Sequence, residues 1–199
     1  RCHTHRAQPA LPQNAYDRLS EKGLSYFDVP HRFVVSYVWD LPWLRNRKDG
    51  VGFIAGGWQL SGIVSVASGQ PFIIQDGSDP NVDGVASDRP NLLRNPNLPA
   101  SQRTLGRWWD TGAFTRIASG TNAYGNAGRN IVIGPNFRNF DASLSKSFRL
   151  REAMNLQFRW EVFNVANHPN FANPSGGSPT NDVSSPLFGQ IQSTQANNE

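Results

Sequence analysis

Residues 154–162 read Met-Asn-Leu-Gln-Phe-Arg-Trp-Glu-Val, and in them apolar and polar side chains alternate without a break. Neighbouring side chains of a β-strand point to opposite faces of the sheet, so this stretch predicts a strand with one apolar and one polar face. A period of two also runs through residues 33–40, 58–67 and 140–149, and Lys146 interrupts the apolar face of the last. A transmembrane β-strand needs about 9–11 residues, which is close to the length of these segments.

Short and long connections alternate between these segments. Residues 150–153 form a charged tight turn and residues 41–57 a moderate connection, whereas residues 70–137 and 166–187 are much longer. Short turns on one side and long loops on the other are typical of a transmembrane β-barrel. Aromatic residues near the short-turn ends fit the girdle expected at a membrane interface: Trp39, Trp43 and Phe148.

The predicted fold class is all-β, an antiparallel transmembrane β-barrel segment with about four or five long strands and long extracellular loops. The fifth and weaker strand begins near Phe188 and runs through Ile191. Because the smallest closed barrels have about eight strands, we expect an incomplete barrel. An alternative from the same alternation is a secreted or surface β-sandwich, a binding module for ligands such as glycans.

The predicted domain organisation has a loop or linker over residues 1–30 that leads into the barrel. Residues 31–195 form the C-terminal portion of the barrel, with a large extracellular loop over residues 70–137. Residues 196–199 are expected to be a truncated tail.

The composition of the 199 residues excludes several classes of protein. With 18 Gly and 14 Pro, the chain does not read as a helical bundle, and no run of about 18 apolar residues predicts a transmembrane helix. The 16 Arg and 3 Lys are scattered singly, so no nucleic-acid footprint is predicted despite the net charge of +4. Cys2 is the one cysteine, which excludes an internal disulfide. No nucleophile, acid and base are paired by spacing, and we expect no enzyme activity.

Nine short motifs follow one another along most of residues 12–192. Together they resemble the C-terminal barrel of TonB-dependent outer-membrane receptors, in the Oar-like group that carries an N-terminal carboxypeptidase-regulatory-like domain. The matching stretches are Phe-Asp-Val-Pro-His-Arg-Phe at 27–33, Leu-Pro-Trp at 41–43, Gly-Trp-Gln-Leu-Ser-Gly-Ile at 57–63, Ser-Gly-Gln-Pro-Phe at 68–72, Asp-Arg-Pro-Asn-Leu at 88–92, Trp-Asp-Thr-Gly-Ala-Phe at 109–114, Gly-Asn-Ala-Gly-Arg-Asn at 125–130, Glu-Val-Phe-Asn at 161–164 and Asn-His-Pro-Asn-Phe at 167–171.

The resemblance implies a protein of the Gram-negative outer membrane that takes up an unidentified ligand, such as a siderophore, an oligosaccharide or a peptide. Its implied partners are outer-membrane lipid, the small ligand, the plug domain of the same receptor, and the TonB complex through parts of the receptor outside this chain. Residues 2–10 match no motif of the group, and no closing strand with a terminal aromatic follows residue 195. We therefore expect a truncated C-terminal segment that is transport-incompetent alone. The polar strand faces would line the lumen: Asp141, Ser143, Ser145, Asn155, Gln157, Arg159 and Glu161.

Two adjacent tryptophans in the large loop, Trp108 and Trp109, are flanked by Arg103 and Arg107. Such a group suits stacking on a sugar or another ring, and it is the candidate ligand site. In the alternative, Trp109 is the aromatic anchor around which the loop packs on itself. The sequence favours this alternative, because Trp109 belongs to the matching stretch at residues 109–114.

Residues 79–84 fit the first half of a calcium loop, with candidate ligands Asp79, Asn81 and Asp83. Pro90 stands where the final Glu of such a loop belongs, and Asp88 is the nearest carboxylate. The alternative, an Asp/Asn/Gly-rich turn in an exposed loop, is favoured by the sequence. Calcium in this external loop is the one cofactor hypothesis, and none is expected otherwise.

Overall fold

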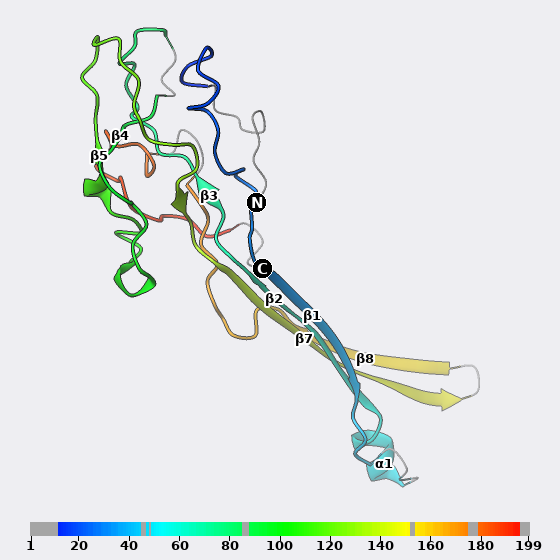
Figure 1. Cartoon of the computed structure of the whole chain (residues 1–199). Coiled ribbons are helices and arrows are strands. Elements are labelled where there is room, and N and C mark those ends of the chain that lie inside the picture. The colour runs from blue at the N-terminus through cyan, green and yellow to red at the C-terminus, as the bar shows by residue number, and fades with distance from the viewer. Residues whose placement is uncertain are drawn as a thin grey trace. The chain divides into compact units, whose positions relative to one another are not determined.

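A computed structural model describes residues 12–44, 47, 49–84, 88–151, 154–174 and 179–195. The chain divides into two compact units (Figure 1). The sheet unit contains residues 31–67 and 137–170, and the loop unit contains residues 12–30, 68–136 and 171–195. The expected tail, residues 196–199, lies outside the described residues, as do residues 1–11.

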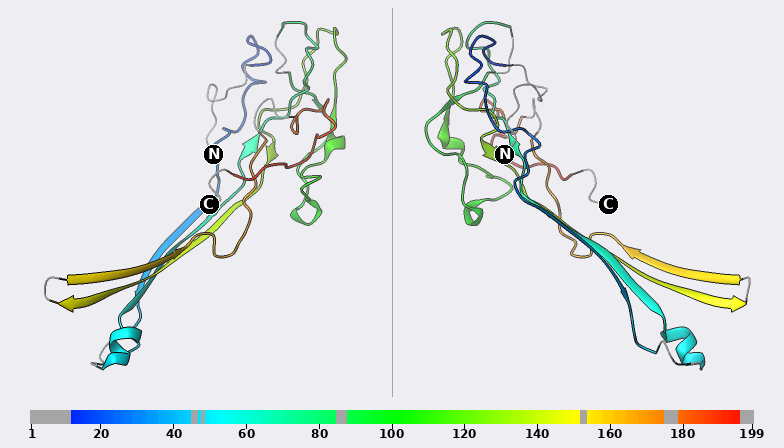
Figure 2. Two further views of the ribbon diagram at one scale, coloured as in Figure 1. Left: turned by 180° about the vertical axis from the view of Figure 1, so that it is seen from behind. Right: turned by 45° about the vertical axis from the view of Figure 1, so that its right-hand side comes forward.

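The sheet unit is built on four antiparallel strands in the order β1-β2-β7-β8, which lie side by side in every view (Figures 1 and 2). Their bounds are Arg32–Asp40 for β1, Trp58–Ala67 for β2, Phe137–Arg151 for β7 and Met154–Val162 for β8. The structure confirms the predicted antiparallel all-β class, and the barrel is not closed. Among the described residues no helix is both long and apolar enough to cross a membrane.

The strand register gathers most apolar residues of the four strands on one face, while Val34, Val38 and Ile63 lie on the opposite, more polar face. Leu60 of β2 is paired with both Trp39 of β1 and Leu144 of β7, and Leu144 is paired with Trp160 of β8. The residues next to these along each strand point to the opposite face. Most of the large apolar side chains of β1 and β8 are exposed, so this face presents a continuous apolar surface. An apolar face of this extent fits contact with lipid.

A short helix, α1 (Gly50–Ala55), lies in the connection between β1 and β2. Asp49 caps its N-terminus by accepting a hydrogen bond from the backbone N–H of Gly52 at 3.0 Å. A Cβ atom at Gly52 would lie 2.1 Å from the carbonyl oxygen of Arg47, so the close approach of the chain requires glycine there. The sequence predicts only a turn here, because a helix of six residues is too short to show a helical period.

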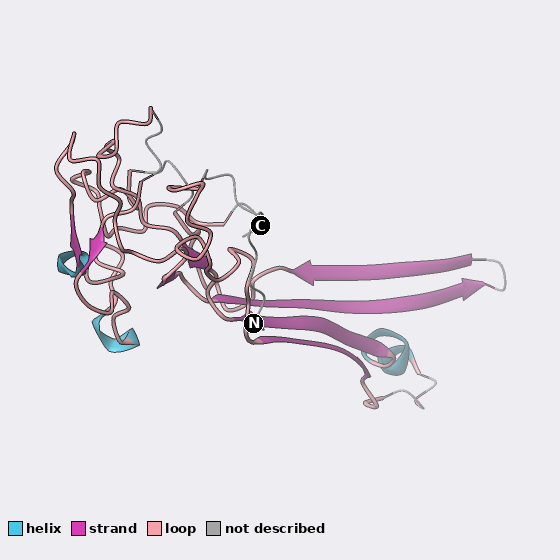
Figure 3. Cartoon of the chain, turned by 45° about the horizontal axis from the view of Figure 1, so that its top comes forward, coloured by secondary structure: helices cyan, strands magenta, loops and turns pink. Residues whose placement is uncertain are grey.

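The loop unit contains little regular structure (Figure 3). Two pairs of very short antiparallel strands and two 3₁₀ turns connect its segments. The bounds are Pro71–Phe72 for β3, paired with Val132–Ile133 for β6; Asn91–Leu92 for β4, paired with Phe114–Thr115 for β5; and Ala100–Gln102 and Thr111–Ala113 for the 3₁₀ turns η1 and η2.

Asparagine side chains hold much of this backbone together. The Asn97 side chain accepts a hydrogen bond from the N–H of Ile133 at 2.9 Å and donates one to the carbonyl of Ile131 at 2.7 Å. It thus satisfies the backbone groups that a neighbouring strand would otherwise satisfy. Asn181 donates in the same way to the carbonyl of Ile73. Side chains that satisfy backbone groups allow a buried segment without long strands.

The loop unit also has a hydrophobic core of its own, with Trp109 at its centre. The Trp109 ring is fully buried and makes edge contacts with Phe72 and Phe188 at centroid distances of 5.2 and 5.5 Å. The other buried residues of this core are Ile74, Ala113, Phe114, Ala127, Val132 and Ile191.

One sequence prediction, the weak fifth strand, differs from this fold. Residues 188–191 form no strand; Phe188 lies in a turn and packs on Trp109, and Ile191 is buried in the loop unit. Alternation over so few residues could not distinguish a strand from a core-anchored turn. Residues 12–30, expected to be a loop or linker, contain no helix or strand and belong to the loop unit, which leaves this expectation a prediction.

The register makes a direct prediction for membrane stability. An arginine at Leu144, on the apolar face of β7, should lower the free energy of unfolding in lipid vesicles by about 2–4 kcal/mol, because a cation is then placed against hydrocarbon. An arginine at the adjacent Ser143, on the polar face and paired with Glu161, should change it by less than about 0.5 kcal/mol. Equal losses in urea titrations of the two variants would contradict the assigned faces.

Candidate functional site

The predicted lumen-facing residues share the polar face of the sheet. Ser143 is paired with Glu161, and Ser145 is paired with Arg159. Arg159 and Glu161, two positions apart on β8, form an exposed ion pair at 2.8 Å. Asp141 accepts hydrogen bonds from the Asn139 side-chain amide and from the backbone of Asn164. The remaining predicted members of this face are Asn155 and Gln157. The seven residues therefore form one polar surface across β7 and β8.

The two predicted tryptophans have different environments. Trp109 is completely buried in the core of the loop unit, which agrees with an aromatic anchor and leaves no ring face open to a ligand. Trp108 is half-buried, and its Nε1 donates to the carbonyl of Ile133 at 3.2 Å. The Arg103 guanidinium lies over the Trp108 ring, 5.7 Å from its centroid. In the sequence, the signal that separates the two neighbours is the motif at residues 109–114, which begins with Trp109.

Arg107 belongs to a second group around Asp110. Arg94 donates to Asp110 at 2.8 Å and Arg107 at 3.4 Å, and both arginine side chains are more than half exposed. The hydrogen bond from Arg94 is the main cause that lowers the pKa of the Asp110 carboxyl. Two guanidinium groups around one carboxylate leave a net positive charge at this surface. Such a surface attracts anionic or hydroxyl-rich ligands.

The predicted calcium ligands are joined by hydrogen bonds of their own. The carboxylate oxygens of Asp79 accept from the backbone N–H groups of Asp83 and Gly84, and the Asn81 side-chain oxygen accepts from the N–H of Asp83, as in an Asx turn. The Asn81 amide donates to Asp83 at 3.1 Å and is 3.5 Å from Asp88. The described residues contain no group of three or more His, Cys, Asp or Glu side chains that could hold a metal ion. Calcium binding by this segment stays a prediction.

Asp88 is a buried carboxyl with acidic neighbours. It is 1% exposed, and one of its oxygens has no hydrogen-bond partner among the described residues. Burial, together with the nearby charges of Asp83, Asp79 and Asp76, raises the pKa of Asp88 to about 6. The sequence offers Asp88 only as a substitute calcium ligand and does not reveal its burial.

A buried ionic network centred on Glu21, the Glu21 network, connects residues 12–30 to the large loop. Arg89 donates to both carboxylate oxygens of Glu21 at 2.9 and 3.0 Å, and Arg129 donates to the same carboxylate at 3.2 Å. Arg89 also donates to the carbonyl of Ala127, and its backbone N–H donates to the Gln13 side chain. No pattern in the sequence pointed to a structural role for Glu21 or Gln13. The one signal for Arg89 was its place in the motif at residues 88–92.

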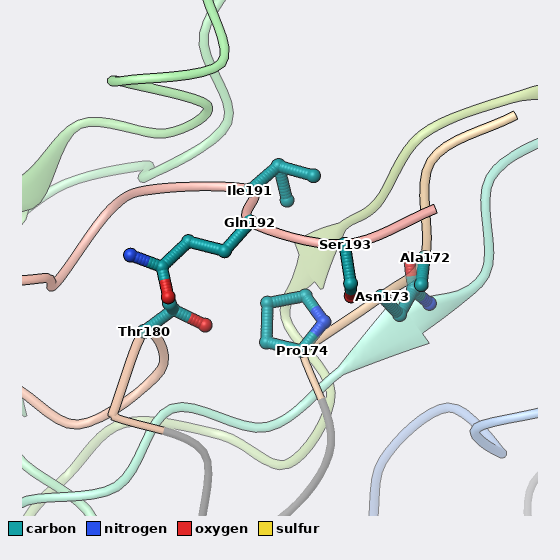
Figure 4. A pocket seen from close by; sticks show the side chains of 7 residues that line it. All are labelled: Ala172, Asn173, Pro174, Thr180, Ile191, Gln192 and Ser193. Atoms are coloured by element: carbon teal, nitrogen blue, oxygen red, sulfur yellow. The ribbon is translucent and has the colours of Figure 1, made fainter. Parts of the chain in front are cut away.

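A small pocket of about 330 Å³ lies within the C-terminal part of the loop unit (Figure 4). Its described lining residues are uncharged, and four of them bring amide or hydroxyl groups: Asn173, Thr180, Gln192 and Ser193. The lining therefore suits a small polar molecule, and it offers no charged acid or base for catalysis.

The comparison with protein families decides between the barrel and the sandwich. The model of a family described as an outer membrane β-barrel domain matches residues 3–198. The chain belongs to this family. Comparison with curated proteins and with solved structures gives no match.

Membership of the outer membrane β-barrel domain family explains the two faces of the sheet. In such barrels the apolar side chains face lipid and the polar side chains face the interior. The family also implies location in the outer membrane. The sandwich alternative is thereby disfavoured, because its apolar face would be covered by a second sheet.

The Glu21 network makes a prediction for the stability of the loop unit. Glu21→Gln leaves Arg89 and Arg129 buried without a compensating carboxylate and should cost about 3–5 kcal/mol. Limited proteolysis or hydrogen exchange of residues 68–136 measures this loss. Arg159→Gln, which removes an exposed ion pair, is the matched control and should cost less than about 1 kcal/mol. Similar protection of wild-type and Glu21→Gln proteins would show that the network does not stabilise the unit.

The raised pKa of Asp88 predicts a pH-dependent stability. Folding favours the neutral form of the Asp88 carboxyl. The stability that this carboxyl contributes is therefore full below its unfolded pKa of 3.8 and is lost as the pH rises to its folded pKa of about 6. The loop unit of the wild type should therefore lose more stability than that of Asp88→Asn between pH 4 and pH 7, and the difference should level off above that range. Denaturant titrations at several pH values test this, and parallel pH profiles for the two proteins would refute it.

Proposed function

We propose that this chain is barrel structure of a TonB-dependent outer-membrane receptor of the Oar-like group. Such a receptor takes up an unidentified ligand with energy transmitted by TonB, and the candidate ligands are a siderophore, an oligosaccharide or a peptide. Family membership and the two-faced sheet support the coarser part of this proposal, a barrel of the outer membrane. The motif set of residues 27–171 supports the finer part.

The observation that carries the proposal is the folded core of the loop unit. A connection that only joins β2 to β7 could be short, yet residues 68–136 fold around the buried Trp109 together with residues from both ends of the chain. Ordering so many residues costs conformational entropy, which the core and the Glu21 network offset. An ordered loop presents a fixed surface, and a fixed surface is what selective capture of a ligand needs.

In the proposed mechanism the exposed arginines of this unit make the first contact with the ligand. The side chain of Arg107 is 59% exposed and makes one long contact with Asp110, so its remaining N–H groups are free of the ion pair. The half-buried Trp108 would add a ring face for stacking. The polar face that includes Arg159 and Glu161 would line the lumen and contact the plug domain.

Uptake measurements test the proposal. The full-length protein is placed in the outer membrane of a receptor-deficient host, and accumulation of three probes is followed: a ferric hydroxamate, a fluorescent maltooligosaccharide and a fluorescent peptide. We expect accumulation of at least one probe that is lost when the proton gradient is collapsed or when the host lacks TonB. Accumulation that persists in both conditions would indicate a passive channel and would overturn energy coupling.

A substitution at the arginine surface predicts a change in uptake without a change in folding. Arg107→Gln should reduce initial uptake of the accepted probe at least about threefold, because one guanidinium contact is lost. Arg47→Gln is the matched control: Arg47 is similarly exposed and ion-paired, but it lies in the connection that carries α1. Equal uptake by the two variants at equal surface expression would exclude Arg107 from ligand capture.

A further inference from the structure

Lys146 is a charged residue on the apolar face of β7, yet it is only 5% exposed. Its Nζ donates to the carbonyl oxygens of Phe53 and Ile54 at 2.6 and 2.9 Å, and also to that of Gly56. These carbonyls belong to the C-terminal end of α1, where the last carbonyl groups of a helix lack partners within the helix. The ammonium group therefore caps α1 and is withdrawn from the lipid-facing surface.

Aromatic contacts fix the same end of α1 to the apolar face. The Phe53 ring packs against Phe148 of β7 at 5.4 Å, and Trp58 of β2 donates from Nε1 to the carbonyl of Ile54 at 3.1 Å. The Lys146 ammonium lies 4.8 Å from the Phe148 ring centroid and 5.7 Å from that of Trp58. Contacts with β2 and β7 thus hold the C-terminal end of α1 on the face that family membership directs to lipid.

The outward side of α1 is apolar and uncovered in the described structure. Val51 is 52% exposed and Ile54 66%, and Phe53, whose ring is partly covered by Phe148, is 49% exposed. The polar groups of this segment lie at the opposite end, where Asp49 caps the helix and pairs with Arg47. One end of the segment is thus suited to water and the other to hydrocarbon, as in helices that lie at a membrane interface.

We propose that α1 lies in the membrane interface at the short-turn end of the barrel, with Val51, Phe53 and Ile54 in contact with phospholipid and Lys146 holding it there. The apolar side of α1 continues the apolar face of β2, β7 and β8, and a lipid leaflet is the occupant that can cover both. Short turns of such barrels face the periplasm, so the contacted lipid belongs to the inner leaflet. The inference rests on family membership and does not depend on coupling to TonB.

Lipid-quenching measurements on the full-length protein test this placement. Cys2→Ser removes the native thiol, and a fluorophore is attached at Ile54→Cys in vesicles of phosphatidylethanolamine and phosphatidylglycerol. Leu156→Cys, on the apolar face of β8 near the same end of the sheet, is the positive control, and the adjacent Gln157→Cys on the polar face is the negative control. Lipids with a nitroxide near the headgroup should quench the Ile54 and Leu156 labels at least about twofold more than the Gln157 label.

The role of Lys146 is tested in the same background by Lys146→Met, which keeps the side-chain length and removes the donor. A spin label at Ile54 should become more mobile, whereas a spin label at Gln157 should keep its spectrum and so report that the sheet is intact. A label at Ile54 that is quenched no more than that at Gln157 would overturn the lipid contact. Unchanged mobility at Ile54 in Lys146→Met would overturn the anchoring role, and if this variant does not assemble, the quenching at Ile54 alone decides the placement.

Discussion

Every backbone N–H and C=O group that leaves water must find a partner, and the two units meet this requirement in different ways. In the sheet unit the long strands β2 and β7 each pair with two neighbours, so the ladder itself supplies the partners. In the loop unit the strands are two residues long, and asparagine side chains such as Asn97 and Asn181 complete the bonding. Such asparagines, of the 19 in the sequence, are therefore part of the architecture of the loop unit. Four asparagines of the chain, Asn122, Asn130, Asn164 and Asn167, also adopt positive φ angles where the chain turns.

Buried charges obey the same requirement in both units. Lys146 is surrounded by carbonyl groups and aromatic rings, and Glu21 is bound by two guanidinium groups and by the backbone of Gln13. In each case the charge connects segments that the chain itself does not connect closely: Lys146 fastens α1 to β7, and Glu21 joins residues 12–30 to the large loop. Each group can stay charged in the interior because its hydrogen-bond partners are all present. Removal of one partner would leave the other group buried with its full desolvation cost.

The sheet could be predicted from the sequence because alternation is a local property that every strand carries by itself. The bounds of β2 and β8 followed from it, whereas β1 begins one residue earlier than expected and β7 is longer at both ends. The loop unit could not be predicted, because its contacts join distant residues without a period, as Glu21 and Arg89 do across 68 positions. Trp109 is an exception, because its place in the motif at residues 109–114 favoured an aromatic anchor and the structure buries it. Lys146 looked like a flaw in the apolar pattern, and its reason became visible only with α1.

The asparagine bonding of the loop unit has a consequence for how such a protein can diversify. The frame is held from inside by amide side chains and a few aromatic residues, and outward positions such as Leu93, Leu105 and Tyr124 contribute little to it. Inherited substitutions at these positions can change shape, charge and hydrogen bonding while the frame keeps its fold. A lineage of such proteins could therefore acquire new specificities through a handful of surface changes, with the membrane-spanning strands left as they are.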